Sequence, residues 1–385
     1  MSVMNVGFDA KRLYNNFTGL GNHSRTTIDI LTEFFPENAY FLYTPKIARG
    51  REESLKRYLS MEACRTIMPQ GVLKGSLWRT YGLPADIRRD GVDLFHGLSN
   101  ELPVGIRRSG VPSVVTIHDV AFHTFPDMYH WIDRQMYDWK WAYAVRNADR
   151  VIAISECTKR DIMRYYDVDA DKIDVVYQPV QPRYYTPMAK EDATKRLEFS
   201  NLQLSSDFML YVGSVNSRKN LLGVVKAMEM LPHDMLIPLV VIGSGSGYMK
   251  EVRQYVAEHG LERYVIFPDG KVDDDTLQAL YACARVFVYP SFYEGFGLPV
   301  VEALLSRCPV VTSNVSSLPE AGGAYSQQAD PADVGDIASK IEKVLADDAL
   351  SSTMREKGYE YAVRTFHPRV LAERLMSVYK AALEI

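Results

Sequence analysis

Residues 285–312 read RVFVYPSFYEGFGLPVVEALLSRCPVVT, and this stretch decides the fold class of the chain. An apolar run at 286–289 has the length and the β-branched and aromatic content of a buried strand. A loop with two glycines follows, and Pro299 suits the first position of a helix that runs to Ser306. A second apolar run at 309–312 completes a strand–helix–strand unit, which predicts neighbouring parallel strands.

The same alternation of short apolar runs and helix-length segments continues along the chain. Continuous apolar strands separated by helices are typical of parallel sheets that are covered on both faces. The sequence therefore predicts an α/β, doubly wound fold. The other expected strands are 3–8, 40–43, 113–117, 150–154, 208–212, 237–242 and 264–267.

The strand pattern begins twice, and a chain of 385 residues has room for two domains. The first set of strands ends near residue 177, and a proline-containing, then charged, stretch separates it from a new strand at 208. A last helical segment begins at Pro368 and carries its apolar residues roughly on one face. The expected divisions are an N-terminal Rossmann-like domain at 1–184, a linker at 185–206, a C-terminal Rossmann-like domain at 207–366, and a final helix at 367–385 that packs back toward the N-terminal domain.

The composition is that of an ordinary globular protein, with 47% apolar and 24% charged residues and a formal net charge of −4. This charge balance gives no indication of nucleic-acid binding, so no nucleic-acid partner is predicted. The four cysteines show no CxxC spacing, which disfavours structural zinc and a disulfide framework. No signal peptide or membrane-spanning stretch is recognisable, so the sequence predicts a cytoplasmic protein that could still contact a membrane surface.

The loop after strand 286–289 carries two carboxylates, Glu294 and Glu302, around Gly295 and Gly297. The glycines allow tight turns and close approach of backbone to a ligand, and a helix start can bind an anion or hydroxyl oxygens. A single glutamate here would more often be a solvated residue, or one that favours the helix dipole. The whole segment, at a strand end, favours a binding site.

A second motif follows strand 208–212, where Gly213 leads into Arg218 and Lys219. Two adjacent cations at a strand end suit a diphosphate, because arginine presents a planar fork and lysine a point charge. An isolated Arg–Lys pair is more often a solvated basic loop. The glycine turn and the strand-end position favour the functional interpretation.

Two further loops of this domain are weaker candidates. Gly243 opens a glycine-rich loop without GxGxxG spacing, and Lys271 and Val272 follow strand 264–267. The acidic run 273–275 could suggest a metal site, but an N-cap and first turn of a helix explain it better.

The N-terminal domain has its own strand-end residues. Gly19 and Gly21 stand before a helix, and Ser155 is expected to cap another. His118 and Asp119 end strand 113–117; a lone histidine there is more often a structural hydrogen-bonding residue. His96 and Asn100, at another strand end, are candidates for the acceptor side of a site.

The segment EGFGLPVVEA resembles the E-x7-E motif of the family 4 glycosyltransferases, SRKN resembles their diphosphate-binding loop, and GKV their base-binding turn. That resemblance implies the GT-B fold, in which two Rossmann-like domains face each other across a cleft. Glu294 would contact the donor sugar and Glu302 the nucleotide ribose, while Arg218 and Lys219 would neutralise the leaving diphosphate. The expected donor-binding residues also include Gly19, Gly21, Gly213, Gly243, Lys271, Val272, Gly295, Phe296, Gly297 and Leu298.

In the same family, a histidine in the place of His118 points at the transferred sugar. The resemblance also implies transfer with retention of anomeric configuration and a front-face exchange, in which the departing diphosphate takes the acceptor proton. The expected catalytic residues are Glu294, His118, Arg218 and Lys219, and neither a metal nor a cofactor is predicted. The N-terminal DAKRLYNNFTGLGNHSR resembles bacterial polysaccharide mannosyltransferases, which favours GDP-mannose as donor and a glycan or lipid-linked acceptor.

Other classes remain to be weighed against this one. A sugar-nucleotide epimerase or a phosphorylase would share the GT-B fold, and a non-catalytic sugar-binding protein would share two α/β lobes. The Arg218–Lys219 pair disfavours the latter, because a neutral sugar needs no diphosphate clamp. A hydride-transfer enzyme would need GxGxxG and an acidic residue about twenty positions on, which are absent.

Basic stretches of the N-terminal domain, some with aromatic residues, allow two interpretations. Residues 73–79, 88–89 and 107–108 could contact anionic lipid head groups or a lipid-linked diphosphate. They could equally be ordinary solvated surface.

Overall fold

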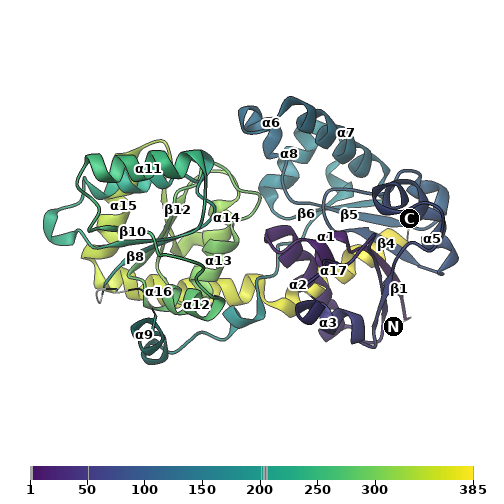
Figure 1. The fold of residues 1–385 in the computed structure, drawn as a ribbon, viewed down its shortest axis with the longest axis horizontal. Helices are drawn as coiled ribbons and strands as arrows, with labels where there is room; N and C mark the ends of the chain where they lie inside the picture. Colours follow the sequence, from purple (N-terminus) through teal and green to yellow (C-terminus); the bar gives the residue numbers. More distant parts are fainter. Residues whose placement is uncertain (1–2, 51, 201, 203, 205–206, 385) are drawn as a thin grey trace. The chain divides into compact units, whose positions relative to one another are not determined.

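The computed structural model describes residues 3–50, 52–200, 202, 204 and 207–384 (Figure 1). The chain divides into two compact units. Unit 1 comprises Met1–Pro179 and Pro368–Ile385, and unit 2 comprises Val180–His367. Within the described ranges, no helix is both long enough and apolar enough to cross a bilayer.

Unit 1 is built on a seven-stranded sheet in which all strand pairs are parallel. Its order places β1 and β4, which are not consecutive, side by side at the centre. The strands in spatial order are β3 (Cys64–Ile67), β2 (Ala39–Tyr43), β1 (Asn5–Asp9), β4 (Leu94–Gly97), β5 (Ser113–Ile117), β6 (Arg150–Ala153) and β7 (Ile173–Val175).

Alternate residues of the unit 1 strands enter two hydrophobic cores, one on each face of the sheet. In β2, Tyr40 and Leu42 join one core, while Phe41 and Tyr43 join the other. Successive side chains point to opposite faces of the sheet, and both faces are buried. The strands are therefore apolar without interruption. The helices of unit 1 are α1 (Lys11–Asn15), α2 (Gly19–Phe34), α3 (Glu52–Ser60), α4 (Gly75–Leu77), the π-helix η1 (Trp78–Gly82), α5 (Leu83–Arg89), α6 (Ala121–Thr124), α7 (Trp131–Asn147), α8 (Glu156–Tyr166) and α17 (Pro368–Leu383).

Unit 2 repeats this plan with six parallel strands. The strands in spatial order are β10 (Val265–Ile266), β9 (Leu239–Ile242), β8 (Met209–Val212), β11 (Val286–Tyr289), β12 (Val310–Ser313) and β13 (Gln327–Ala329). The helices are α9 (Lys190–Glu198), α10 (Leu221–Met228), α11 (Gly247–Glu258), α12 (Asp274–Cys283), α13 (Leu298–Leu305), α14 (Leu318–Gly322), α15 (Val334–Ala346) and α16 (Asp348–Phe366).

The stretch expected as a linker at 185–206 contains structure of its own. Helix α9 packs against α12 of unit 2, and Arg196 forms an ion pair with Asp273, at 2.8 Å. Unit 2 accordingly begins at Val180, earlier than expected. The charged composition of α9 reflects a solvated helix with a narrow apolar face, which includes the buried Ala193 and Leu197.

Helix α17 returns the chain to unit 1. It packs on α2 and on the central strands, and Leu375, Met376 and Tyr379 enter the core beside β1. The apolar face of the C-terminal segment therefore fills one side of the first sheet, where Figure 1 shows the yellow end of the chain beside α2.

Two helix starts differ from expectation, and the start of α12 agrees with it. Gly19 and Gly21 lie inside the first turn of α2 and not before it. Helix α13 begins at Leu298, so Pro299 is its second residue and Glu302 lies in the second turn. Helix α12 begins at Asp274 and is capped by Asp273, whose Oδ1 accepts a 2.8 Å hydrogen bond from Thr276 N.

Both sheets change direction at one point: between β1 and β4 in unit 1, and between β8 and β11 in unit 2. Loops leaving two neighbouring strands in opposite directions open a crevice at the carboxyl edge, where doubly wound proteins bind ligands. In unit 2 this edge carries Gly213 after β8 and the 290–297 loop after β11.

Two glycines of α2 provide a matched pair for a stability test. A Cβ atom on Gly21 would lie 1.7 Å from the carbonyl oxygen of Asn16, whereas a Cβ on Gly19 would meet nothing within 4 Å. We expect Gly21→Ala to lower the unfolding free energy by about 1–3 kcal/mol, since the turn must move. Gly19→Ala should be neutral or slightly stabilising, because alanine is a better helix former. Equal denaturation midpoints for the two variants would contradict this packing.

Candidate active site

Glu294 occupies the point where the loops after β8 and β11 meet. Its Oε1 accepts hydrogen bonds from Tyr289 OH at 2.9 Å and from Ser291 Oγ at 3.0 Å. Lys219 Nζ lies 3.0 Å from the same oxygen, and Arg218 Nη1 lies 3.2 Å from Oε2. The carboxylate is thus held on both oxygens by groups from two separate loops.

The two cations belong to a short 3-10 turn, η6 (Ser217–Lys219). Asn216 caps this turn by accepting a 3.2 Å hydrogen bond from Lys219 N. The turn is tied to the β11 loop, because Arg218 O accepts from Phe292 N at 2.8 Å and from Ser291 Oγ at 3.0 Å. Arg218 also donates to the carbonyl of Tyr293. The guanidinium and the ammonium are therefore held in place before any ligand binds.

The electrostatics of Glu294 follow from these partners. Burial alone raises the pKa of this carboxyl, but the charges of Lys219 and Arg218 and the hydrogen bonds from Lys219 and Tyr289 outweigh it, and the pKa falls to about 2. Glu294 is ionised at neutral pH. Two cations around one carboxylate leave a local excess of one positive charge.

The backbone around the cluster needs glycine at two positions. A Cβ on Gly243 would lie 1.8 Å from the carbonyl oxygen of Gly213, so the loops after β8 and β9 are in backbone contact. Gly297 is the N-cap of α13 with φ at +116°, and a Cβ there would lie 2.8 Å from Leu318 Cδ2. These glycines allow the loops to approach each other at the edge of the sheet.

Glu302 has a different environment from Glu294. Its Oε2 accepts a 3.2 Å hydrogen bond from Tyr281 OH, whose ring packs edge-on against Tyr184. Burial raises the pKa of Glu302 to about 8, the nearby Asp274 adds to this, and the bond from Tyr281 opposes it. At neutral pH the folded protein therefore holds this carboxyl mainly as the neutral acid, which can donate a hydrogen bond to a hydroxyl oxygen.

The remaining unit 2 candidates are less closely grouped. Phe296 is buried and packs edge-on against Phe366, so its backbone and not its ring is available to a ligand, whereas Leu298 is only half-buried. Lys271 and Val272 line a separate pocket of about 260 Å³ after β10. One strand separates β10 from β8, so this pocket lies about 10 Å along the sheet edge from the cations, within the span of a nucleotide.

In unit 1, His118 is enclosed by protein. Its Nε2 donates to the carbonyl of Leu98 at 2.9 Å, and its Nδ1 accepts from Gln178 Nε2 at 2.7 Å. Burial lowers its pKa to about 4, so the ring is neutral. Asn100 accepts from His118 N at 2.7 Å, which ties the loop after β4 to the end of β5. Both ring nitrogens of His118 already have partners. The expected contact with the sugar would therefore come from the His118 backbone, or would require the ring to turn.

His96 occupies a core position. Its ring nitrogens bond to Tyr379 OH at 2.7 Å and to Thr116 Oγ1 at 2.8 Å, and it is 1% exposed. The expected acceptor-side role does not fit this position, because both ring nitrogens of His96 are bonded within the core, where the bond to Tyr379 holds α17 against the sheet. Asp119 remains half-buried at the end of β5, where its Oδ1 accepts from Ala121 N at 3.1 Å.

Several residues of the site carry no sequence signal of their own. Tyr289 and Ser291 hold Glu294, while Ser316 and Ser317 bond to its backbone N and O at 3.1 and 2.8 Å. Tyr289 is the last residue of β11. Its position at the end of a strand beside the switch point is the one feature of the sequence that could have identified it. The described residues hold no group of three or more His, Cys, Asp or Glu that could bind a metal ion.

The cluster is suited to a polar ligand with a dinegative group. Arg218 and Lys219 present donors and charge to a diphosphate, while Glu294 can accept hydrogen bonds from sugar hydroxyls. Such an arrangement, on a Rossmann-like sheet edge, has the groups that an enzyme acting on a nucleotide sugar requires.

Comparison with known proteins agrees with this class. The model "Glycosyl transferases group 1" matches residues 193–361, and "Glycosyltransferase Family 4" matches residues 39–184. "O-antigen chain mannosyltransferase B" of Escherichia coli is 35% identical over 272 residues, 70% of this chain and 69% of that protein. "Serotype-specific mannosyltransferase WbdA" of the same species is 29% identical over 67% of this chain, which spans 32% of WbdA.

Solved structures share the whole fold. The structure of Anabaena Alr3699/HepE in complex with UDP and glucose superposes with a TM-score of 0.74 at 18% identity, over 98% of this chain and 100% of that one. The two parallel sheets are those of the GT-B fold. The chain belongs to family 4 of the glycosyltransferases and is an enzyme of that class.

The two glutamates should have opposite effects on stability as pH changes. The folded-state pKa of Glu294 lies below the ordinary value of 4.5, so its stabilisation is complete above pH 4.5 and is lost as pH falls toward 2. Glu302 has a raised pKa, so it destabilises the fold increasingly from pH 4.5 to about 8.

We therefore expect Glu294→Gln to lower the unfolding free energy by about 3 kcal/mol at pH 7, because two cations lose their buried partner. Glu302→Gln should be more stable than the wild type at pH 8 and equal to it at pH 4.5. Denaturation midpoints measured from pH 2 to pH 8 test both, because the Glu294 effect changes below pH 4.5 and the Glu302 effect changes above it. A pH-independent difference for either variant would show that its charge state is misassigned.

Proposed function

We propose that the chain transfers a mannosyl group from GDP-mannose to a glycan or lipid-linked acceptor in polysaccharide biosynthesis, with retention of anomeric configuration. The observation that carries this proposal is the Glu294–Arg218–Lys219 cluster at the β8/β11 switch point. Similarity to the E. coli mannosyltransferases supports mannose as the sugar. We place the enzyme in the cytoplasm, peripherally at the membrane when its acceptor is lipid-linked.

The proposed mechanism assigns the donor phosphates to Arg218 and Lys219. As the bond between the anomeric carbon and the phosphate oxygen breaks, negative charge builds on the leaving diphosphate, and these fixed cations stabilise it. The acceptor oxygen attacks from the same side of the sugar, and its proton passes to the departing phosphate oxygen. No protein nucleophile or metal takes part in this scheme.

Glu294 acts in two ways in this scheme. Before the donor binds, it holds the cations in place. With donor bound, the diphosphate competes for them, and the carboxylate is free to accept sugar hydroxyls and to offset positive charge at the anomeric carbon. In the same scheme, Glu302, a neutral acid on α13 beside Tyr281, binds the ribose hydroxyls.

Other functions fit the site less well. A sugar-nucleotide epimerase would share the diphosphate clamp but would return an epimeric sugar nucleotide and need no acceptor. A non-catalytic sugar-binding protein would not need two preset cations. Both alternatives predict no transfer to an acceptor, so product analysis separates them from the proposed function.

Loss of one cation should slow transfer strongly. We expect Arg218→Ala to lower kcat by roughly 10²–10³-fold, the usual effect of removing a transition-state hydrogen-bond donor. Glu294→Ala should also lower kcat/KM, while Arg263→Ala, an exposed arginine of the same unit, should match the wild type. Initial rates with GDP-mannose measure this. Wild-type rates for both site variants would show that the site lies elsewhere, and loss of activity in excess chelator would refute the metal-free scheme.

The donor itself can be identified by thermal shift. GDP and GDP-mannose should raise the melting temperature, by an amount that grows with ligand concentration, because they bind only the folded protein. UDP-glucose should have a smaller effect, and NAD none. The slow hydrolysis of one donor without acceptor then reports the transferred sugar. A larger shift with UDP-glucose would replace GDP-mannose but leave the transferase assignment intact.

A further inference from the structure

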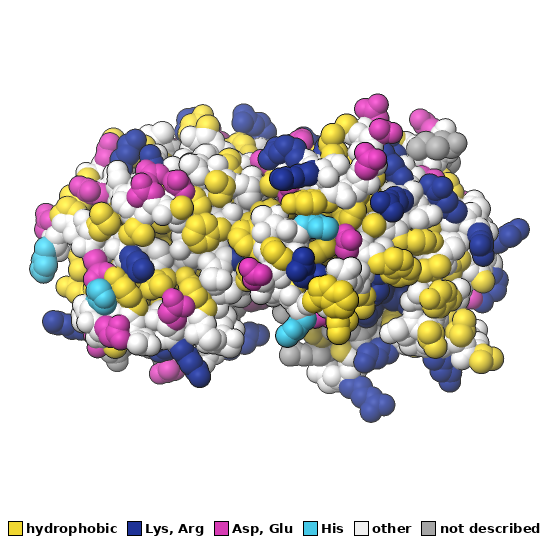
Figure 2. All heavy atoms as spheres, turned by 90° about the horizontal axis from the view of Figure 1, so that it is seen from above, with side chains coloured by type: hydrophobic (Ala, Val, Ile, Leu, Met, Phe, Trp, Pro, Cys, Tyr) yellow, Lys and Arg dark blue, Asp and Glu magenta, His cyan; other side chains and the backbone are white. Residues whose placement is uncertain are grey.

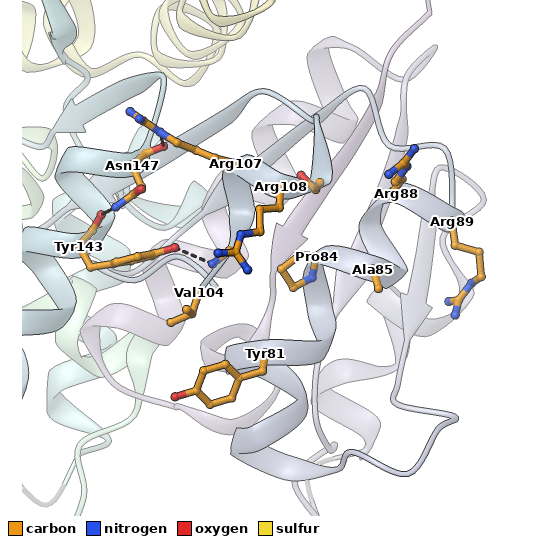
Figure 3. Close-up of a pocket in the computed structure, with 12 residues that line it drawn as sticks. Tyr81, Pro84, Ala85, Arg88, Arg89, Val104, Arg107, Arg108, Tyr143 and Asn147 are labelled. Carbon is orange, nitrogen blue, oxygen red and sulfur yellow. Dashed lines mark hydrogen bonds between the residues drawn. The ribbon is translucent and has the colours of Figure 1, made fainter.

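A large pocket of unit 1 lies away from the residues discussed above. It has a volume of about 960 Å³ between α5, the loop at 104–109 and the end of α7 (Figure 3). Residues that precede β4, β5 and β6 line it, so much of it lies toward the amino ends of the strands, opposite to the edge that carries His118. Its lining residues are Tyr81, Pro84, Ala85, Arg88, Arg89, Val104, Gly105, Arg107, Arg108, Ser109, Tyr143 and Asn147.

The pocket is strongly basic. Four arginines line it, and the described lining residues include no carboxylate. Arg89 is neutralised by Asp86 and Asp90, at 2.5 and 3.0 Å, and Arg107 donates to the carbonyls of Arg146 and Asn147. Figure 3 shows Arg108 between Tyr143 and Pro84, with Arg88 and Arg89 on the α5 side.

Arg88 and Arg108 differ from their neighbours. Both are exposed, and neither has an ion-pair or hydrogen-bond partner within the described ranges. The pocket wall beside Arg108 is fixed, since Tyr143 OH accepts a 2.6 Å bond from Gly105 N and Asn147 donates to Tyr143 O at 2.8 Å, while Arg88 stands on α5. Guanidinium groups without an ion-pair partner are good phosphate ligands, so Arg88 and Arg108 are the two side chains of this pocket best suited to bind a phosphate group.

Exposed apolar side chains adjoin the pocket. More than half of the exposed large hydrophobic side chains in the described part of the chain lie in two segments, 68–81 and 128–139. They include Leu77 at 60%, Trp131 at 69% and Ile132 at 72% exposure. Figure 2 shows hydrophobic side chains gathered on the part of the molecule that carries α7, with Lys and Arg around them.

Contacts connect this apolar surface to the basic pocket. Trp139 of α7 stacks on Tyr143 of the pocket wall, with ring centroids 6.1 Å apart. On the other side, Val104 N donates to Thr80 O at 2.7 Å, which fixes the 73–82 segment beside the same wall. Trp131 lies two turns, about 12 Å, along α7 from Trp139. The arginines and the apolar residues thus belong to one surface.

The chemistry of this surface fits a lipid bilayer better than a free glycan. Aromatic rings can pack against either a sugar or a lipid. Exposed Leu, Ile and Val side chains make no favourable contact with a polar sugar, but they can insert at the boundary between lipid headgroups and acyl chains. Apolar patches of this kind mark contact sites on soluble proteins. Basic residues beside them add attraction to anionic lipids.

We propose that unit 1 docks on an anionic phospholipid membrane, with the exposed side chains of 72–81 and 131–139 at the interface and a lipid headgroup phosphate in the pocket of Arg88 and Arg108. This docking proposal extends the proposed function, on which it rests only for the location of the enzyme at the membrane. Its test measures binding and not transfer, so a wrong donor or acceptor leaves it unaffected.

The test is co-sedimentation of the full chain with vesicles that contain phosphatidylglycerol, and with phosphatidylcholine vesicles. We expect binding to the first only, and release by added salt, because exposed charges are screened. Arg88→Ala with Arg108→Ala should weaken binding roughly 30-fold, at about 1 kcal/mol per basic residue and tenfold per 1.4 kcal/mol. Trp131→Ala with Ile132→Ala should weaken it at least about tenfold.

A matched control is Arg253→Ala with Arg263→Ala, which removes two exposed arginines of unit 2 and should bind like the wild type. Equal binding to phosphatidylcholine vesicles, or wild-type binding by the Arg88/Arg108 variant, would overturn the proposal. Binding of inorganic phosphate that depends on Arg108, without vesicle binding, would assign the pocket to a soluble phosphorylated ligand instead. The transfer rate to a soluble acceptor should stay unchanged in the docking variants, whose melting temperatures confirm folding.

Discussion

The pairing of one buried carboxylate with two cations is the constraint on which the unit 2 site depends. Glu294, Arg218 and Lys219 come from loops after two strands that are distant in sequence and adjacent in the sheet. An isolated buried charge would be too costly to keep, so each group requires the others. The same pairing therefore stabilises the loops and holds the cations in place. In the proposed function, an incoming diphosphate would replace a partner that already carries negative charge.

The two glutamates of the motif show that spacing does not determine chemistry. Glu294 has a pKa of about 2 and Glu302 one of about 8, although they are eight residues apart. The difference arises because two cations outweigh the effect of burial on the first, whereas burial and the nearby Asp274 raise the pKa of the second. The two carboxyl groups thus present a hydrogen-bond acceptor and a neutral donor, which in the proposed function would bind two kinds of hydroxyl group in one elongated ligand.

Much of the fold could be predicted from the sequence, because buried parallel strands are apolar without interruption. The edge strands β3 and β13 could not, since CRTI and QQA are short and partly polar. The motif residues of unit 2 were recognisable by type and strand-end position. The core role of His96 was not, because it depends on Tyr379, 283 residues away in the chain. The start of α13 was expected at Pro299 and lies one residue earlier, at Leu298, because proline fits either of the first two helical positions.

The cations of the unit 2 site and those of the unit 1 pocket have different physical environments. In unit 2 the cations are mostly buried and matched by a carboxylate, so their effect is short-ranged and selects a ligand that can enter the site. In unit 1 the arginines at 88 and 108 are exposed and unmatched, so their field extends into solvent over a Debye length of roughly 8–10 Å. A net charge of −4 averages over both environments. Whole-chain charge therefore argues against a polyanion that would cover the protein, but it does not argue against a local contact between one basic surface and an anionic membrane.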